Sequence, residues 1–270
     1  MLARRVLMVR PATFVSDPET RASNAFQASG ALSREAVLGE FDGFVQALRR
    51  EGIDVWVLDD TPEPPKPDAI FPNNWVTFFP GQAVVHSMLA AARRLERREE
   101  ALVGREVIDL SSGPVLEGTG SMVLDREAKT AFAALSARTT RGGLRLFSER
   151  MGYRVVAIET SPEVYHTNVL MTLGPQFAVL CREVIVDDAE VMAALEGREV
   201  IEITAEQMSQ FCGNMLVLDG PILVLSEAAH RALSEDQVRR LERHAKLVPV
   251  AIPEIEKLGG SARCMLAEVF

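Results

Sequence analysis

Residues 259–270 read Gly-Gly-Ser-Ala-Arg-Cys-Met-Leu-Ala-Glu-Val-Phe, and the organisation of the chain can be worked out from them. The pair Gly259 and Gly260 lets the backbone adopt a positive φ or approach a ligand closely. Cys264 follows and begins an apolar run that predicts a final strand over residues 264–270. A single cysteine in such a place is most often a small core residue, so any functional role depends on the residues that the fold places beside it.

The composition is that of a globular chain with a substantial core. Of the 270 residues, 47% are hydrophobic and 25% are charged, which allows both a buried core and a solvated surface. The net charge is −9, and this acidic balance argues against a nucleic-acid surface, which would need a basic stripe. We expect one domain over residues 1–270 that binds a small molecule and neither nucleic acid nor a membrane. A homo-oligomer stays open.

Cysteines and histidines are too scattered to predict a metal site. Neither CxxC nor HExxH occurs among the 3 cysteines and 4 histidines, although such spacings are the usual signature of zinc ligands. The residues from Met1 to Leu7 contain no long apolar segment, and no other run is long enough to cross a bilayer. We therefore expect no metal, no cofactor, free thiols and a cytoplasmic location.

Four turn signals reveal a repeat. Pro80-Gly81, Asp125-Arg126, Gly174-Pro175 and Asp219-Gly220 each separate two strand-like apolar runs, as hairpin turns do. A predicted helix and another strand follow each hairpin. The helices are expected at 91–102, 144–151, 188–195 and after the capping box Ser234–Gln237, and the next strands at 107–110, 153–158, 200–203 and 247–252. The turns recur about every 45 residues, which indicates a propeller or another repeat array.

The two ends of the chain supply a fifth unit. Residues 6–10 predict a strand, the apolar face from Val37 to Leu48 predicts a helix, and residues 53–58 predict another strand. The terminal strand 264–270 completes this unit if it pairs with strand 6–10, and such pairing closes a ring that has no open edge. The proline-rich stretch 61–67 is interpreted as a stiff connection between units.

Polar residues with useful chemistry recur at one phase of the repeat, shortly before each hairpin turn. Equivalent positions of a closed ring converge on its axis, so these residues are expected to meet in one pocket. They are Asn73, Asn74, Glu117, His166, Asn168, Asn214 and Cys264. Each has an ordinary alternative: the asparagines as turn residues, Glu117 as a loop carboxylate, His166 as a satisfied strand histidine. The convergence of the set carries the functional hypothesis.

A cysteine, a histidine and a glutamate in one pocket have the makings of nucleophilic catalysis. The thiolate is the attacking species, the histidine can pass a proton to a leaving group, and the glutamate can hold a protonated group in place. Asparagine side chains offer both a donor and an acceptor, which suits a planar amide-like group.

Five motifs together make the chain resemble the guanidino-group-modifying, or pentein, superfamily. They are Phe71-Pro72-Asn73-Asn74, Glu117-Gly118, Ser136-x-Arg138-Thr139, His166-x-Asn168 and Gly260-x-x-Arg263-Cys264. The superfamily includes arginine deiminases, dimethylarginine dimethylaminohydrolases and amidinotransferases, and the sequence is most similar to the citrulline-utilisation hydrolase branch. The resemblance spans nearly the whole chain. It implies an α/β fold, a five-bladed α/β propeller of strand–strand–helix–strand units.

The resemblance also implies roles for single residues. Cys264 would be the nucleophile, His166 the general acid and base, and Glu117 the carboxylate that binds the substrate nitrogens. Arg138 corresponds to an arginine that holds the substrate carboxylate, with help from Arg94 or Arg93. The remaining candidates for substrate binding are Asn73, Asn74, Asn168 and Asn214, and a loop over the pocket is expected to carry Asn24 and Gln27.

One departure from the superfamily's pattern bears on the substrate. Related enzymes usually carry carboxylates at the position of Asn74 and, in deiminases, at that of Asn168, where the acids pair with a cationic guanidinium. Two neutral asparagines favour a neutral planar group such as a ureido group. The first hypothesis is hydrolysis of citrulline to ornithine. The alternatives are hydrolysis of arginine, methylated arginine or succinylarginine, amidino transfer, and an inactive pentein that serves as a binding protein.

Overall fold

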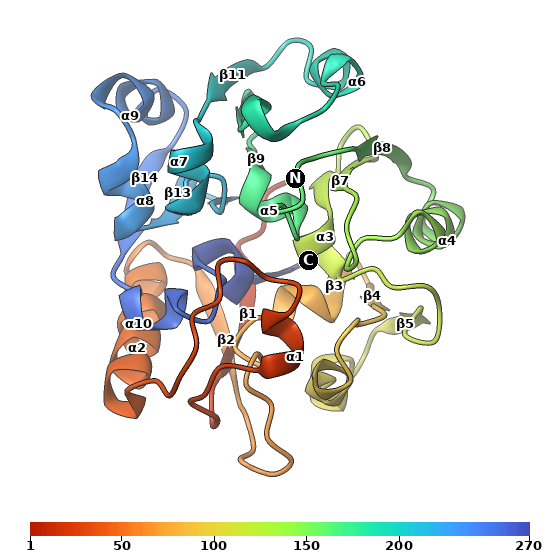
Figure 1. Ribbon diagram of the computed structural model, residues 1–270, viewed down its shortest axis with the longest axis vertical. Helices are drawn as coiled ribbons and strands as arrows, with labels where there is room; N and C mark the ends of the chain where they lie inside the picture. The colour runs from red at the N-terminus through yellow and green to blue at the C-terminus, as the bar shows by residue number, and fades with distance from the viewer.

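The computed structural model describes residues 1–270 and contains five separate three-stranded sheets. Figure 1 shows these sheets following one another around the middle of the molecule. In every sheet the first strand is antiparallel to the second, and the second is parallel to the third. The sheets are β15 (Ala267–Val269), β1 (Arg5–Arg10) and β2 (Asp54–Asp59); β3 (Val76–Phe79), β4 (Gln82–Val85) and β5 (Glu106–Asp109); β6 (Val123–Asp125), β7 (Thr130–Ala134) and β8 (Arg154–Ile158); β9 (Met171–Leu173), β10 (Phe177–Leu180) and β11 (Glu199–Glu202); and β12 (Leu216–Leu218), β13 (Ile222–Ser226) and β14 (Lys246–Val250).

The four predicted hairpins are confirmed. Each turn signal lies between the first and second strands of a sheet, as in the pair β3 and β4. Gly81 and Gly220 have φ angles of 73° and 103°, a left-handed conformation that residues with a side chain rarely adopt. The glycine in these turns therefore reverses the chain without backbone strain.

The pairing of the chain ends is confirmed, but the start of the last strand is not. β15 runs antiparallel to β1, with Arg5 opposite Val269 and Leu7 opposite Ala267. The predicted strand from residue 264 was too long, because Cys264 lies in a 3-10 turn, η5 (Ala262–Met265), before the strand begins. Each sheet remains an open set of three strands.

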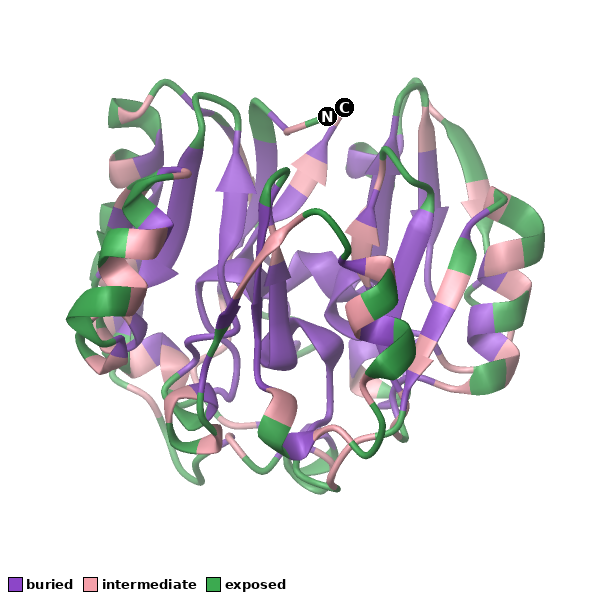
Figure 2. Ribbon diagram, turned by 90° about the horizontal axis from the view of Figure 1, so that it is seen from above, coloured by how far each residue is buried: buried purple, intermediate pink, exposed green.

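Helices on the outside connect the second and third strands of four sheets. They are α2 (Arg34–Arg50), α4 (Arg141–Met151), α6 (Ala189–Ala194), and the pair α8 (Glu227–Ala232) and α9 (Glu235–Glu242). The sequence predicts the start of α9 through its cap, and Ser234 with Gln237 forms the expected capping box. Figure 2 shows exposed residues on the outer helices and mostly buried residues along the strands. The remaining short helices are α1 (Pro18–Arg21), α7 (Ala205–Ser209), α10 (Pro253–Glu256) and the 3-10 turn η4 (Arg182–Val184).

The prediction of a helix over residues 91–102 is wrong. This segment forms two 3-10 turns, η2 (Ala92–Glu96) and η3 (Glu99–Ala101). Its residues are good helix formers, but tertiary contacts override local propensity here. The side chain of Arg93 is drawn into the interior, where it donates to the carbonyl oxygens of Asp68 and Phe71 at 3.3 Å each.

A short helical turn precedes the first strand of four sheets. These turns position the polar residues that recur before each hairpin. These turns are η1 (Pro72–Asn74), α3 (Gly118–Ser121), α5 (Thr167–Leu170) and η5. In the fifth sheet the turn around residues 211–214 takes the same place before β12. Figure 1 shows α3 and α5 near the middle of the molecule. None of the helices combines the length and the apolar character that crossing a membrane requires.

Candidate active site

The fold brings the three predicted catalytic residues and two of the predicted substrate-binding residues to a single cavity or directly behind it. Cys264, His166, Asn74 and Arg138 line the cavity, and Glu117 contacts His166 from behind. The other lining residues are Asn24, Phe71, Arg93, Tyr165, Leu258, Gly259 and Gly260. The cavity has a volume of about 10 Å³, which is roughly the space that one water molecule needs. The cavity is thus too small to hold an amino acid.

The loop before α2 closes the cavity, as the sequence predicted. Asn24 donates from Nδ2 to the carbonyl oxygen of Gly259 at 3.0 Å, and its own Oδ1 accepts from the amide of Phe26. Gln27 lies behind it and accepts from the Thr20 hydroxyl at 3.0 Å. Tyr165 reaches the same carbonyl of Gly259 with its hydroxyl. The loop and the residues before Cys264 are therefore joined over the site.

The sulfur of Cys264 contacts two amide groups. Nδ2 of Asn168 lies 3.3 Å from Sγ, and Nδ2 of Asn214 lies 3.2 Å from it. His166 lines the same cavity, but its only side-chain hydrogen bond is to Glu117. The sequence predicted that Asn168 and Asn214 orient the substrate. In the structure, the side-chain amides of both residues lie within hydrogen-bond distance of the Cys264 sulfur.

His166 and Glu117 form a buried pair. Nε2 of His166 lies 2.8 Å from Oε2 of Glu117, and the other carboxylate oxygen accepts from the amide of Leu89 at 3.1 Å. Burial lowers the pKa of His166 to about 4, against the raising effect of Glu117. Burial would raise the pKa of Glu117, but the His166 hydrogen bond and the charge of Arg138 hold it at about 2. At neutral pH the ring is therefore uncharged, and Nδ1 is the nitrogen left to take a proton.

This pair makes the stability of the protein depend on pH. The folded pKa of His166, about 4, is lower than its unfolded value of about 6.5, so the unfolded chain binds the extra proton first. The stabilising contribution is fully present above about pH 6.5 and is lost as pH falls toward 4, by about 1.4 kcal/mol per pH unit. Urea unfolding of wild type and His166→Gln between these pH values measures the effect. The variant should show a shallower decline, and equal slopes would contradict the prediction.

Two buried arginines supply positive charge at the cavity. Nη1 of Arg138 lies 3.5 Å from Oε2 of Glu117, and Nη1 of Arg93 lies 3.9 Å from it. Arg138 also donates to the hydroxyl of Ser23 at 3.0 Å and stacks on the ring of Tyr165. Glu117 is the one carboxylate that pairs with Arg138, whereas Arg93 has two further carboxylate partners, Glu96 and Asp68.

Asn74 lies against Arg93. Its amide satisfies all its hydrogen bonds when its oxygen accepts from the two terminal nitrogens of Arg93, at 2.7 and 3.2 Å, and its nitrogen donates to Asn73 Oδ1. The glycine at 120 permits this arrangement, because a Cβ there would lie 2.3 Å from the amide group of Asn74 and 2.8 Å from the His166 ring. Gly120, the third residue of α3, thus allows close packing of the two side chains.

Arg93 is itself held by a second pair of carboxylates. Its Nε lies 2.8 Å from Oε1 of Glu96 and 4.0 Å from Oδ2 of Asp68. Burial raises the pKa of Glu96 to about 7 and also raises the pKa of Asp68, although Arg93 opposes both effects. Arg93 is therefore the positive charge that opposes protonation of this buried acidic cluster.

Removing Arg93 should cost much stability. In Arg93→Met, two buried carboxylates lose their partner, and breaking a buried ion pair costs about 3–5 kcal/mol. The matched control is Arg94→Met at the next position, where the side chain is exposed and the expected change lies within about 0.5 kcal/mol. Urea unfolding of both variants measures the free energies. Equal losses for the two variants would contradict this assignment of the buried charge.

Two of the predicted substrate-binding residues neither line the cavity nor contact the sulfur of Cys264. Arg94 is exposed and donates to the backbone carbonyl of Met88 at 3.1 Å, so the alternative position, Arg93, is the one that the structure brings to the site. Asn73 is buried behind the cavity, where its carbonyl oxygen accepts from Thr119. Neighbouring positions in η1 and η2 point in different directions, and the sequence pattern alone did not resolve which of them points inward.

Sequence reasoning missed three residues of the site. Tyr165 packs its ring on His166, with centroids 4.8 Å apart, and Asp68 and Glu96 surround Arg93. The position of Tyr165 beside His166 in the sequence was a usable signal. Nothing in the sequence marks Asp68 and Glu96, because their burial follows from the unexpected 3-10 turns.

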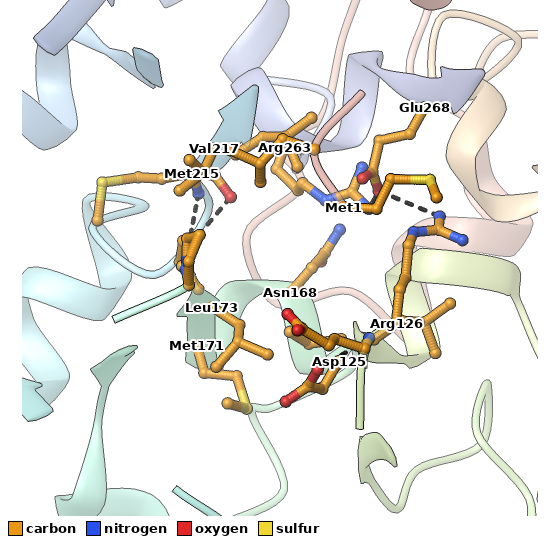
Figure 3. A pocket seen from close by; sticks show the side chains of 18 of the residues that line it. Met1, Asp125, Arg126, Asn168, Met171, Leu173, Met215, Val217, Arg263 and Glu268 are labelled. Atoms are coloured by element: carbon orange, nitrogen blue, oxygen red, sulfur yellow. Dashed lines mark hydrogen bonds and ion pairs between the residues drawn. The ribbon is translucent and has the colours of Figure 1, made fainter. Parts of the chain in front are cut away.

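A second, larger cavity of about 130 Å³ lies on the other side of Asn168. Figure 3 shows its charged side chains, which come from several different strands and turns. Glu268 pairs with Arg263 at 3.1 Å and with Arg126 at 3.5 Å, and Asp125 pairs with Arg198 at 2.6 Å. Both of these carboxylates are thus paired with arginines of the protein. Across the whole structure, no three His, Cys, Asp or Glu side chains are grouped so that they could hold a metal ion.

Comparison with protein families identifies the relatives of this chain. The family model described as N,N dimethylarginine dimethylhydrolase, eukaryotic, matches residues 10–270. The chain belongs to this family. It is therefore a pentein, as its motifs suggested, and the resemblance to guanidino-group-modifying enzymes is confirmed. No curated protein matches the sequence.

Solved structures of other penteins share the fold of this family member. A cysteine-to-serine mutant of the N-terminal domain of ArgZ, an arginine dihydrolase from cyanobacteria, was solved bound to substrate; it has a TM-score of 0.82 and 16% identity, with 98% of each chain covered. A cysteine-to-alanine mutant of AgrE with L-arginine has a TM-score of 0.84 and 17% identity. There the match covers 98% of this chain but only 40% of AgrE. A dimethylarginine dimethylaminohydrolase adduct with S-methyl-L-thiocitrulline has a TM-score of 0.74 and 17% identity over 99% of each chain.

Proposed function

We propose that this protein is a cysteine-dependent hydrolase that cleaves a guanidino or ureido C–N bond of an arginine-like amino acid. The observation that carries the proposal is the meeting of Cys264, His166 and the Glu117 carboxylate around one buried cavity. Membership of the dimethylarginine dimethylhydrolase family supports the reaction class. We further propose that residues 1–270 form one pentein domain. Its five sheets would close into a propeller through the pairing of β15 with β1.

The reaction follows from the positions of the sulfur and the imidazole. Cys264 attacks the planar carbon, the C–N bond breaks, and the carbon stays bound to sulfur. His166 takes a proton at Nδ1 from a water molecule and passes it to the departing nitrogen. The hydroxide that is left attacks the sulfur-bound carbon and releases the thiolate. With citrulline, the products are ornithine and carbamic acid, which decomposes to ammonia and carbon dioxide.

The charges around the cavity support a neutral reacting group and an anionic tail. Asn74 turns its oxygen to Arg93, and Glu117 is already balanced by His166 and two arginines. A cationic guanidinium would therefore find no unpaired carboxylate in the closed site, whereas a ureido group needs only hydrogen bonds. Citrulline, giving ornithine, remains the first candidate substrate.

Arginine and dimethylarginine form the second candidate class. The family description names dimethylarginine, and the structurally similar AgrE was solved with L-arginine. An asparagine-to-serine mutant of ArgZ was solved with a covalently bound reaction intermediate, which agrees with the sulfur-linked intermediate proposed for this chain.

A substrate panel tests the proposed function. The protein is incubated separately with citrulline, arginine and dimethylarginine, and the released ornithine, citrulline, ammonia and dimethylamine are measured, with Cys264→Ala in parallel. Ornithine from citrulline, absent in the variant, is the expected result. Turnover of arginine or dimethylarginine but not of citrulline would contradict citrulline as the substrate and would still agree with nucleophilic attack by Cys264. No turnover of any of the three would contradict the proposal and favour a binding protein.

Arg138 is the residue proposed to hold the substrate carboxylate. Its guanidinium lies at the cavity and is tied to the covering loop through Ser23. A charge-assisted hydrogen bond contributes about 1.5–3 kcal/mol, so Arg138→Gln should raise KM by roughly 10- to 100-fold with a smaller effect on kcat. The control is Arg141→Gln, an exposed arginine that pairs with Glu159. Unchanged KM in Arg138→Gln, measured by steady-state kinetics, would remove Arg138 from this role.

A further inference from the structure

The proposed reaction gives Tyr165 no part, yet this buried side chain contacts several parts of the site. Its ring packs on the imidazole of His166, with centroids 4.8 Å apart, and the guanidinium carbon of Arg138 lies 5.3 Å from the ring centroid. The ring of Phe26 packs on it at 5.7 Å. Phe26 belongs to the loop over the cavity, residues 17–28, called the covering loop below. One ring therefore contacts the proposed general base, the proposed carboxylate-binding arginine and the covering loop.

The hydroxyl of Tyr165 and the amide of Asn24 share one acceptor. Both donate to the carbonyl oxygen of Gly259, and the bond from Asn24 is 3.0 Å long. A backbone carbonyl oxygen has two lone pairs, so these two donors fill it. Burial raises the pKa of Tyr165 well above its ordinary value, so the hydroxyl keeps its proton and remains a donor. Tyr165 and the covering loop are therefore tied to the same point of the chain, shortly before Cys264.

The close approach of the covering loop requires a glycine at position 259. The φ angle of Gly259 is 77°, a conformation that residues with a side chain rarely adopt. A Cβ at this position would lie 2.4 Å from Nδ2 of Asn24 and 2.9 Å from Cβ of Gln27. The backbone at Gly259 therefore forms a close-fitting seat for the covering loop.

A second route connects Tyr165 to the covering loop through Arg138. The hydroxyl of Ser136 donates to the carbonyl oxygen of Tyr165 at 2.8 Å and accepts from the backbone amide of Arg138 at 3.1 Å. The guanidinium of Arg138 donates to the carbonyl oxygen of Thr20 at 2.6 Å and to the hydroxyl of Ser23 at 3.0 Å. Thr20 and Ser23 both belong to the covering loop. The Ser136-x-Arg138 motif thus joins the loop to the backbone of Tyr165.

We propose that Tyr165 is a positioning residue that couples closure of the covering loop to the alignment of His166 and Arg138. With the loop closed, Phe26 and the shared carbonyl hold the ring of Tyr165 against the imidazole and the guanidinium. An amino acid cannot enter a cavity of about 10 Å³, so the loop must open to admit it. Opening removes Asn24 from the carbonyl and Phe26 from the ring, and alignment is complete only after reclosure. This inference rests on the proposed function, in which these two groups act on the substrate.

Hydrogen exchange of the protein without substrate tests the part played by the hydroxyl. Tyr165→Phe keeps the ring but removes one donor from Gly259, and a net hydrogen bond of ordinary strength changes an opening equilibrium by about two- to tenfold. Amides of the covering loop should exchange faster by about that factor, while those of α9 keep their rate. The matched control is Tyr153→Phe, at the other tyrosine, which is also buried and packs on Phe79 and Phe147. Unchanged loop exchange in Tyr165→Phe, or equal acceleration in both variants, would overturn the inference.

Asn24→Ala tests the coupling from the side of the loop. It removes the loop's donor to Gly259, and Asn24 has no hydrogen bond to His166 or Arg138. Exchange should become faster in the covering loop and also in the peptide that contains Tyr165 and His166, with α9 again unchanged. Faster exchange confined to the covering loop would contradict the coupling. This variant leaves Tyr165 intact, so it also serves if Tyr165→Phe does not fold.

The kcat of two variants separates alignment from folding. Tyr165→Leu removes the ring from His166, and a displacement of about 1 Å at a catalytic group can cost roughly 10²-fold in rate. We expect kcat to fall by about 10- to 100-fold in Tyr165→Leu, whereas Tyr165→Phe keeps the ring and most of the wild-type kcat. Equal falls in the two variants would show that the ring does not align the imidazole. The exchange measurements use no substrate, so their outcome is independent of the substrate panel.

Discussion

Replacing Cys264 with serine is expected to lower kcat by more than about 10⁴-fold and to leave the melting temperature nearly unchanged. The side chain is buried, and a hydroxyl can accept the same hydrogen bonds from Asn168 and Asn214 that the sulfur accepts. A hydroxyl at neutral pH is a far weaker nucleophile than a thiolate, because no base contacts it here to remove its proton. The loss should therefore fall on chemistry and not on folding.

A matched cysteine provides the control. Cys212 is also buried and makes one hydrogen bond, from Sγ to the carbonyl oxygen of Ala229 at 3.3 Å. Burial raises the pKa of its thiol to about 12, so this cysteine is inert at neutral pH. Cys212→Ser should keep most of the activity of the wild type. Turnover by Cys264→Ser comparable to that of Cys212→Ser would show that the sulfur of Cys264 is not the nucleophile.

His166→Gln is expected to lower kcat by about 10²- to 10⁴-fold, the usual contribution of a general acid and base. Glutamine can still donate from its amide to Glu117, so the buried carboxylate keeps a partner. It cannot relay a proton between water and the departing nitrogen. The second half of the reaction should suffer more than the first, because attack by water depends on removing a proton from it.

Accumulation of the covalent intermediate distinguishes this role from a purely structural one. Mass spectrometry of the acid-quenched His166→Gln protein should show a larger fraction carrying a substrate-derived adduct on Cys264 than wild type under the same conditions. In the variant the departing nitrogen takes its proton directly from water, so the adduct still forms, but the water that must then release it has no base to remove its proton. A variant that loses activity and also forms no adduct would contradict the assignment of His166 to hydrolysis of the intermediate.

The repeat and the meeting of polar residues could be predicted from the sequence because both depend on local signals. Glycines at turns, caps such as Ser234 and alternating apolar runs mark each unit wherever it lies in space. Once the units are aligned, Glu117 and His166 occupy the same phase, and the structure places them 2.8 Å apart. The pairing of β15 with β1 followed from counting strands.

The details that depend on side-chain direction could not be predicted. The segment 91–102 has the composition of a helix, yet burial of Arg93 with Glu96 forces 3-10 turns, and this choice also decides that Arg93 rather than Arg94 reaches the cavity. The sequence predicted Asn168 and Asn214 as substrate-binding residues but did not predict that their amides contact the sulfur, and the orientation of the Asn214 amide depends on a backbone hydrogen bond from Arg263. No spacing pattern encodes such a contact.

A single-turnover experiment tests the central proposal, the attack of Cys264 on the guanidino or ureido carbon, most directly. Excess enzyme is mixed with the best substrate of the panel, carrying an isotopic label at that carbon, and the reaction is quenched in acid at successive times. The label should appear on the peptide that contains Cys264 before it appears in free product, and it should leave the peptide as product forms. Labelled product that forms while the protein carries no label at any time would contradict covalent catalysis by Cys264.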